Sequence, residues 1–281
     1  MTIDPMEQLE NRDFRVAFFD VDGTLLGFNG EYTQRLKNAL WCARDKGLKT
    51  AIASGRPMFA TEFLIDDLGL VDAGVFYTGA LVYDPSRAIT LSQHALGNEE
   101  IASLLAVAKS HGIYTEIYTR DHFYIEGPHP IAAKHSHHLR CNPIVGCFDD
   151  MPDDPVIKLL LAVTEPDQHQ LLQALEEQFP HLIFAYAHLA EEPDWLFVSV
   201  ISDQACKKQA FLQLLKYYDA RPDQVLAFGD AQSDMQFLSL AGTGVAMGNA
   251  SDQVKQVADL VTLPVWDDGV AHVLEMITQD G

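Results

Sequence analysis

Three short apolar runs, each ending abruptly in polar residues, limit the fold of this chain more than any other feature. They are Val16–Phe19 before Asp20, Thr50–Ala53 before Ser54, and Val225–Phe228 before Gly229 and Asp230. Runs that are apolar on both faces are typical of buried parallel strands. Because such strands end at one edge of a sheet, we expect the polar residues that follow them to gather there.

Amphipathic helical patterns separate these runs. Leu36, Ala39, Leu40 and Ala43 recur at helical spacing, and a glycine suited to a helix C-terminus follows at Gly47. The β-α-β-α-β order predicts an α/β fold, a doubly wound, Rossmann-like parallel sheet with right-handed crossovers. Further elements are expected as a helix at 58–68, a strand at 74–77, a helix at 211–218, strands near 244–247 and 260–263, and a helix at 270–277.

The middle of the chain has a different pattern. Apolar and polar residues alternate there, as in antiparallel strands with one covered face. We predict an inserted α+β cap domain at 84–197 within a core domain made of 1–83 and 198–281. Its expected elements are strands at 114–119, 123–126, 183–188 and 195–200, helices at 101–108 and 172–179, and an exposed loop at 141–155.

Composition narrows the function. The formal net charge of −21 disfavours binding to nucleic acid or to an anionic membrane surface, so an anionic substrate needs local positive groups or a metal. No apolar run approaches the ~20 residues that span a bilayer, and the acidic N-terminus has no signal-peptide pattern. Four cysteines without zinc or redox spacing are typical of reduced thiols. We expect a cytoplasmic protein that binds a small molecule.

Asp20 and Asp22 are the first candidates for chemistry. Side chains two apart on a strand point to the same side, and two carboxylates held that close repel each other. A proton or a shared cation relieves the repulsion, and Mg²⁺ prefers such oxygen ligands. Gly23 allows a sharp turn after the strand. The alternative, an acidic turn that only begins a helix, fits the string FFDVDGTLL poorly.

With these residues in view, the chain resembles the haloacid dehalogenase-like hydrolases, and within them the Cof-type phosphatases with a large α+β cap. The resemblance covers both core segments. Its motifs, in chain order, are DxDGT at Asp20–Thr24, a serine after the next strand at Ser54, a lysine at the start of a helix at Lys207, and GDxxxD at Gly229–Asp234.

The resemblance implies a role for each matched residue. Asp20 is the nucleophile that carries the phosphoryl group, and Asp22 is the general acid and base. Mg²⁺ is held by Asp20, the main-chain carbonyl of Asp22, Asp230 and, directly or indirectly, Asp234. Phosphate is bound by Ser54, Gly55 and Lys207, with Arg56 contacting either the substrate or the cap. The implied substrate is a small phosphorylated metabolite such as a sugar phosphate.

Several positions depart from the family pattern or have a simpler explanation. The family usually has glycine after its lysine, where this chain has Lys208, so either Lys207 or Lys208 could be the one that reaches the site. Relatives often have asparagine at Ser233 and at Thr78, and Asn-Asp where Val265 and Trp266 stand. These differences bear on substrate affinity rather than on the nucleophile.

Other functions remain alternatives. A phosphomutase on the same scaffold would protect its aspartyl phosphate from water. A receiver-like domain phosphorylated on Asp20 would lack both the acid at Asp22 and the insert, and a degenerate binding module would not retain the full set of motifs. The histidines at 135, 137 and 138 lack the spacing of a metal site and favour a solvated helix or loop.

Overall fold

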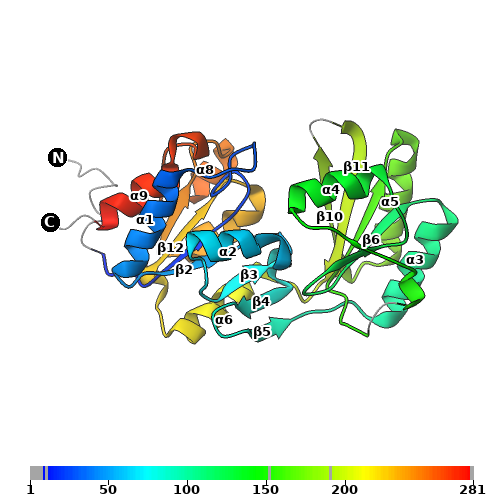
Figure 1. Cartoon of the computed structure of the whole chain (residues 1–281), viewed down its shortest axis with the longest axis horizontal. Helices are drawn as coiled ribbons and strands as arrows, with labels where there is room; N and C mark the ends of the chain where they lie inside the picture. Colours follow the sequence, from blue (N-terminus) through cyan, green and yellow to red (C-terminus); the bar gives the residue numbers. More distant parts are fainter. Residues whose placement is uncertain (1–8, 10–11, 151–152, 190–191, 279–281) are drawn as a thin grey trace. The chain divides into compact units, whose positions relative to one another are not determined.

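The computed structural model describes Leu9 and residues 12–150, 153–189 and 192–278. The chain forms two compact units (Figure 1). The first comprises residues 1–56, 62–91 and 206–281, and the second comprises 57–61 and 92–205. The units divide about eight residues later than the predicted limits at 83/84 and 197/198. Both limits fall inside strands, β4 (Leu81–Asp84) and β11 (Glu192–Ser202), which each stay within one unit. That the second unit serves as a cap stays a prediction.

The first unit is built on a parallel sheet with the strand order β14-β13-β12-β1-β2. The strand at Val16–Phe19 pairs in parallel with a neighbour on each side, with Val16 opposite Val225 on one side and Lys49 on the other. The predicted doubly wound α/β core is therefore confirmed. The strands are β1 (Val16–Phe19), β2 (Lys49–Ile52), β12 (Val225–Gly229), β13 (Thr243–Ala246) and β14 (Leu260–Val261).

One face of this sheet is covered by α6 (Lys207–Tyr218), α7 (Met235–Leu240) and α8 (Asp252–Val257). Phe18 of β1 contacts the rings of Phe211 and Phe237 at centroid distances of 6.1 and 5.4 Å. Since side chains alternate along a strand, Phe19 points to the opposite face, where it stacks on Phe228 at 5.0 Å. This double coverage explains why the strands are apolar throughout.

Two further helices lie together in the first unit. α1 (Gln34–Asp45) and α9 (Gly269–Thr278) run side by side (Figure 1), joined by a bidentate ion pair from Arg35 to Glu275. α1 begins where Thr33 accepts a hydrogen bond from the amide of Leu36. The expected helix at 58–68 is split into a 3₁₀ turn at Phe59–Thr61 and α2 (Glu62–Leu68).

The third predicted parallel strand belongs mainly to another sheet. β3 (Gly74–Phe76) forms a parallel bridge from Val75 to Ala53, the residue after β2, but it pairs antiparallel with β4 (Leu81–Asp84). β4 in turn neighbours β5 (Ile89–Gln93). The turn at Tyr77–Gly79 reverses the chain before a longer parallel pairing can form.

The second unit contains a mostly antiparallel sheet with the order β10-β11-β9-β6-β7-β8. The predicted strand pairs are present, and a central strand not predicted above, Lys158–Val163, lies between them. The elements are α3 (Asn98–Ser110), β6 (Tyr114–Tyr118), β7 (Phe123–Ile125), α4 (Pro130–Leu139), β8 (Ile144–Val145), β9 (Lys158–Val163), α5 (His169–Gln178), β10 (Leu182–Leu189) and β11 (Glu192–Ser202).

The two faces of that sheet differ in chemistry. The face toward α3 and α5 is apolar, and Leu159 on this face belongs to one buried cluster with Leu104 of α3 and Leu172 of α5. On the other face, fully buried Glu116 accepts hydrogen bonds from Tyr114, Tyr118 and His135 at 2.7, 2.5 and 2.9 Å. The expectation that the histidine cluster is solvated is therefore wrong for His135, because α4 turns this side chain onto the sheet, whereas His137 and His138 are exposed.

In the part of the chain that the structure describes, no helix has the length and apolar character needed to span a bilayer.

Candidate active site

The end of β1 places two carboxylates, those of Asp20 and Asp22, at the edge of the parallel sheet. Asp20 is buried and continues the ladder through its amide, which donates to the carbonyl of Phe228. Gly23 then adopts φ +79°, and a Cβ built there would lie 2.1 Å from Oδ2 of Asp230. Glycine is therefore required twice, for the left-handed turn and for the close approach of the next carboxylate.

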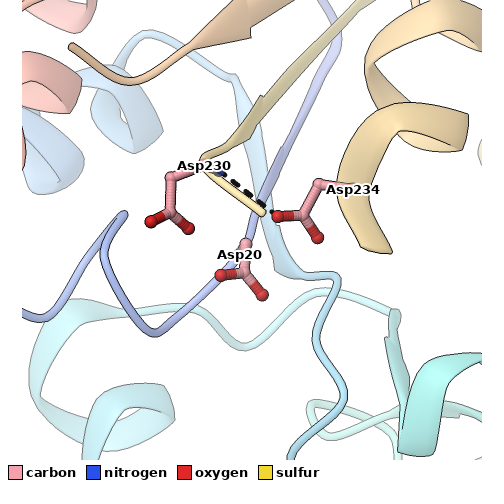
Figure 2. Close-up of side chains that lie close together, drawn as sticks. All are labelled: Asp20, Asp230 and Asp234. Carbon is pink, nitrogen blue, oxygen red and sulfur yellow. Dashed lines mark hydrogen bonds between the residues drawn. The ribbon is translucent and has the colours of Figure 1, made fainter. Parts of the chain in front are cut away.

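Three carboxylates converge at this edge (Figure 2). They belong to Asp20 after β1, Asp230 after β12 and Asp234 in the turn before α7, and one ligand oxygen from each lies within 4.8 Å of the others. Asp234 also closes the turn, since its Oδ2 accepts hydrogen bonds from the amides of Asp230 and Ala231 at 3.3 and 3.0 Å. Residues from both ends of the chain thus meet, as the strand-end pattern predicts.

The pKa values of these carboxyls show how costly the cluster is without a cation. Burial, followed by the charge of Asp234, raises the pKa of Asp20 well above its usual range, although Lys207 opposes the shift. The same two causes raise the pKa of Asp230 to about 6. Oδ1 of Asp230 is buried and has no hydrogen-bond partner among the described residues. Unpaired buried oxygens in an acidic cluster indicate a site for a cation.

Lys207 is the lysine that reaches the cluster. It is the first residue of α6, is 4% exposed, and places its Nζ 3.1 Å from Oδ1 of Asp234, whereas Lys208 is exposed. The close packing of Gly79 helps to fix this helix start, since a Cβ there would lie 3.0 Å from the backbone nitrogen of Lys207. The structure thus favours Lys207 over Lys208.

The loop after β2 brings Ser54, Gly55 and Arg56 to the same edge. Ser54 is buried, and its Oγ accepts a hydrogen bond from the amide of Arg56 at 3.3 Å. The guanidinium of Arg56 donates two hydrogen bonds of 2.7 Å to the carboxylate of Asp22. Arg56 therefore has a partner that neither sequence-based alternative named, and the side chain of Asp22 lies on Arg56 instead of joining the three-carboxylate cluster.

Asn249 is a residue whose contribution the sequence reasoning missed. Its Nδ2 donates to the carbonyl of Gly23 and to Oδ2 of Asp230 at 2.9 and 3.0 Å, while its Oδ1 accepts from the amide of Val265. One amide thus joins three segments around the cluster. Its position in the string VAMGNA, which follows the family pattern, was the available signal.

The donor set fits a divalent metal. Carboxylate oxygens are the ligands that Mg²⁺ prefers, and a bound dication would satisfy the partnerless oxygen of Asp230 and offset the repulsion within the cluster. Asp20, Asp230 and Asp234 are the side chains that could hold it.

Comparison with known proteins decides the family. A profile of haloacid dehalogenase-like hydrolases matches residues 17–274, which is most of the chain. The chain belongs to this family. The haloacid dehalogenase-like fold extends over both units, since the match spans the inserted segment as well as the two core segments.

Curated phosphatases are similar to this haloacid dehalogenase-like hydrolase over nearly their whole length. The 5-amino-6-(5-phospho-D-ribitylamino)uracil phosphatase YitU of Bacillus subtilis is 26% identical over 271 residues, covering 95% of this chain and 98% of the relative. Phosphatase YwpJ of the same organism is 26% identical over 301 residues, covering 93% and 99%. These relatives, together with the family, identify the chain as a phosphatase of the Cof type, as the motifs predict.

Solved structures agree on the fold. A haloacid dehalogenase-like hydrolase from Bacteroides thetaiotaomicron gives a TM-score of 0.84 at 23% identity, covering 94% of this chain and 99% of that one. A protein from Thermotoga maritima gives 0.83 at 25% identity, covering 95% and 98%. At such low identity the first of these supports the fold alone.

Proposed function

We propose that the chain is a Mg²⁺-dependent phosphatase that hydrolyses small phosphomonoesters through an aspartyl phosphate on Asp20. The observation that carries this proposal is the meeting of Asp20, Asp230, Asp234 and Lys207 at the edge of one parallel sheet. Phosphoryl transfer requires mainly positioning and charge neutralisation, which buried carboxylates, a metal and one ammonium group can supply.

In the first step an oxygen of Asp20 attacks phosphorus while the ester P–O bond breaks. Asp22 donates a proton to the leaving oxygen, which departs as an alcohol. In the second step Asp22 takes a proton from a water molecule that attacks the aspartyl phosphate, and this releases inorganic phosphate. The ion pair with Arg56 holds the Asp22 side chain away from the metal-binding carboxylates. It also favours the ionised form of Asp22, which suits the base step, and the acid step requires Asp22 to take up a proton first.

The remaining residues bind charge. Lys207 offsets the negative charge of Asp20 and of the phosphoryl group, a role supported by its opposing effect on the pKa of Asp20. Ser54 Oγ and the amide of Gly55 are the proposed phosphate donors. Bound to Asp20, Asp230, Asp234 and the carbonyl of Asp22, Mg²⁺ would act as a Lewis acid that neutralises phosphate oxygens.

The substrate is proposed to be a small phosphorylated metabolite. The acidic surface makes nucleic acid an unfavourable partner, and curated relatives are named as phosphatases of a ribitylaminouracil phosphate. The second unit is proposed to act as a cap that excludes water during the first step and selects the leaving group. We expect this enzyme to work in the cytoplasm.

The test is phosphate release by the purified protein from a panel that contains sugar phosphates, pyridoxal phosphate, flavin mononucleotide and 5-amino-6-(5-phospho-D-ribitylamino)uracil. Each ester is assayed with Mg²⁺ and with excess chelator. Asp20→Asn is the key variant and Asp219→Asn, an acid at the C-terminus of α6, is the matched control. Release that requires both Mg²⁺ and Asp20 supports the proposal. Substantial turnover by Asp20→Asn would exclude the covalent mechanism, and a stable phospho-protein without release would favour the mutase.

A further inference from the structure

A cavity separate from the three-carboxylate cluster lies in the first unit, beside the turn that follows β1 and Asp20. It has a volume of about 390 Å³ and lies between the segments around Leu25–Leu36 and Val265–Val270. None of Asp20, Asp230 and Asp234 lines it. The proposed phosphatase chemistry therefore makes no use of this cavity.

Two aromatic side chains form an open platform at this cavity. Phe28 is 84% exposed and Trp266 is 59% exposed, and their ring centroids lie 5.9 Å apart with a tilt of 34°. Neighbouring large aromatic side chains with so much accessible surface are unusual on a soluble domain and indicate a binding surface. Trp266 is also one of the positions where the chain departs from its family's pattern.

The charge around the platform has one sign. Glu31 and Asp268 line the cavity, and none of the described residues that line it is basic. Arg35 is close enough to sense the charge of Asp268, but its guanidinium donates both of its hydrogen bonds to Glu275. The lining therefore combines aromatic faces with two carboxylates, which accept hydrogen bonds from the neutral side chains of Asn29 and Thr33.

A polar group inside the wall also lacks a partner. Thr24 lines the cavity and is 1% exposed, and its Oγ1 makes no hydrogen bond to any described residue. Buried hydroxyls are nearly always paired, so an unpaired one indicates a ligand or water that completes the site. This observation is independent of the aromatic platform and of the charge.

We propose that this cavity binds a small organic cation, an ammonium or quaternary ammonium group that rests on the faces of Phe28 and Trp266 near the carboxylates of Glu31 and Asp268. Aromatic faces attract cations through their quadrupole, and the attraction grows when the cation loses water. A neutral aromatic ligand would gain from the platform but not from the two carboxylates. An anion would be repelled by them.

Two hydrogen bonds link the wall of the cavity to the carboxylate cluster. The residue before Trp266, Val265, donates its amide hydrogen to Asn249, and Asn249 holds Oδ2 of Asp230. Asn249 thus bridges the backbone beside the platform and the carboxylate of Asp230. The proposed binding is nevertheless separate from catalysis and can be measured without a phosphate ester.

The experiment compares choline with its neutral isostere 3,3-dimethylbutan-1-ol, by ligand-observed NMR titration of the whole protein with saturating Mg²⁺. The saturating metal keeps choline from reporting on the three-carboxylate cluster. We expect choline to bind at least about fivefold more tightly than the isostere, as a cation–π contact with nearby carboxylates predicts. Equal affinities, or no choline binding up to about 50 mM, would overturn the proposal.

Variants locate the site. Trp266→Leu should weaken choline binding about tenfold, Trp266→Phe should retain most of it, and Asp268→Asn should weaken it several-fold. Asparagine tolerates the left-handed backbone of Asp268, whose φ is +58°. The matched control is Trp41→Leu, since Trp41 is 45% exposed but does not line the cavity. Choline binding that is unchanged in Trp266→Leu would overturn the proposal, and failure of phosphate release in the wild type would not affect it.

Discussion

At the scale of single residues, Asp230 links proton binding to metal binding. Its pKa is raised to about 6, so the folded chain holds this proton more tightly than the unfolded chain does. Without metal, the contribution of Asp230 to folding stability is therefore lost as the pH rises from its ordinary pKa of 3.8 to about 6. A metal reverses this, because it binds the ionised carboxylate.

We therefore expect Mg²⁺ to raise the midpoint of thermal unfolding more at a pH of about 7 than at about 5, since at the lower pH it must displace a proton. Differential scanning calorimetry at both pH values, with Asp230→Asn alongside, measures this. The variant should lose most of the Mg²⁺ effect. An equal Mg²⁺ effect at both pH values in the wild type would contradict the assignment.

Arg56 is expected to orient the proposed acid. Arg56→Ala should lower kcat by about 10- to 100-fold, because Asp22 loses its bidentate contact with the guanidinium. Arg56→Lys should recover only part of the rate, since an ammonium group cannot reproduce the planar bidentate contact.

Steady-state kinetics on the best phosphate ester separate this role from substrate binding. If Arg56 orients Asp22, the loss falls on kcat. A variant whose defect lies wholly in KM would point instead to direct contact between Arg56 and the substrate. Arg44→Ala, which breaks another ion pair of the first unit, to Asp72, controls for general destabilisation.

The sequence was informative about these residues to different degrees. Asp20 and Asp230 were predicted to meet because each follows a solid apolar run, and strand ends converge whatever the loops do. The pairing of Arg56 with Asp22 was not predictable, because it depends on how two loops turn after their strands. The three contacts of Asn249 likewise depend on loop geometry.

At the scale of elements, β6 of the second unit carries a buried ionised network. Burial alone would raise the pKa of Glu116, but hydrogen bonds from His135, Tyr118 and Tyr114 lower it below its ordinary value. Its contribution to stability is therefore present above the ordinary pKa of 4.5 and is lost as the pH falls through the lower folded value.

Glu116→Ala should destabilise the second unit by about 3 kcal/mol, because it removes the acceptor of the buried Tyr118 hydroxyl and of the partly buried Tyr114 and His135. Hydrogen–deuterium exchange of β6 and β9 measures the loss. Glu176→Ala is the matched control, since exposed Glu176 accepts one hydrogen bond from exposed Tyr186 and should cost under about 1 kcal/mol. Comparable losses in the two variants would show that the network adds nothing.

Elements whose apolar residues recur with a clear helical or strand spacing were predicted well, whereas the strand β9 was not predicted. Lys158–Val163 is a central strand that is apolar on both faces, like the parallel strands of the core, but it pairs antiparallel, and in the middle of the chain only alternating patterns were assigned to strands. β3 was assigned to the parallel sheet because its residues are equally apolar. Its antiparallel pairing depends on the turn at Tyr77 and Thr78, two non-glycine residues with positive φ.

At the scale of the whole molecule, the net charge of −21 should oppose an incoming phosphate ester. Salt screens this repulsion over a Debye length of about 10 Å at 0.1 M. We expect kcat/KM to rise about two- to fivefold as NaCl increases from about 20 to 200 mM at saturating Mg²⁺. A fall over this range would mean that positive groups near the site dominate the approach of substrate.

Because the first unit is discontinuous in sequence, its strands are synthesised at different times. β1, which carries the nucleophile, leaves the ribosome roughly two hundred residues before β12, its neighbour in the sheet. At translation rates of about 5–20 residues per second, that gap lasts roughly 10–40 s. The whole second unit is synthesised within this interval, so it can fold before β12, the strand that completes the site, has been made.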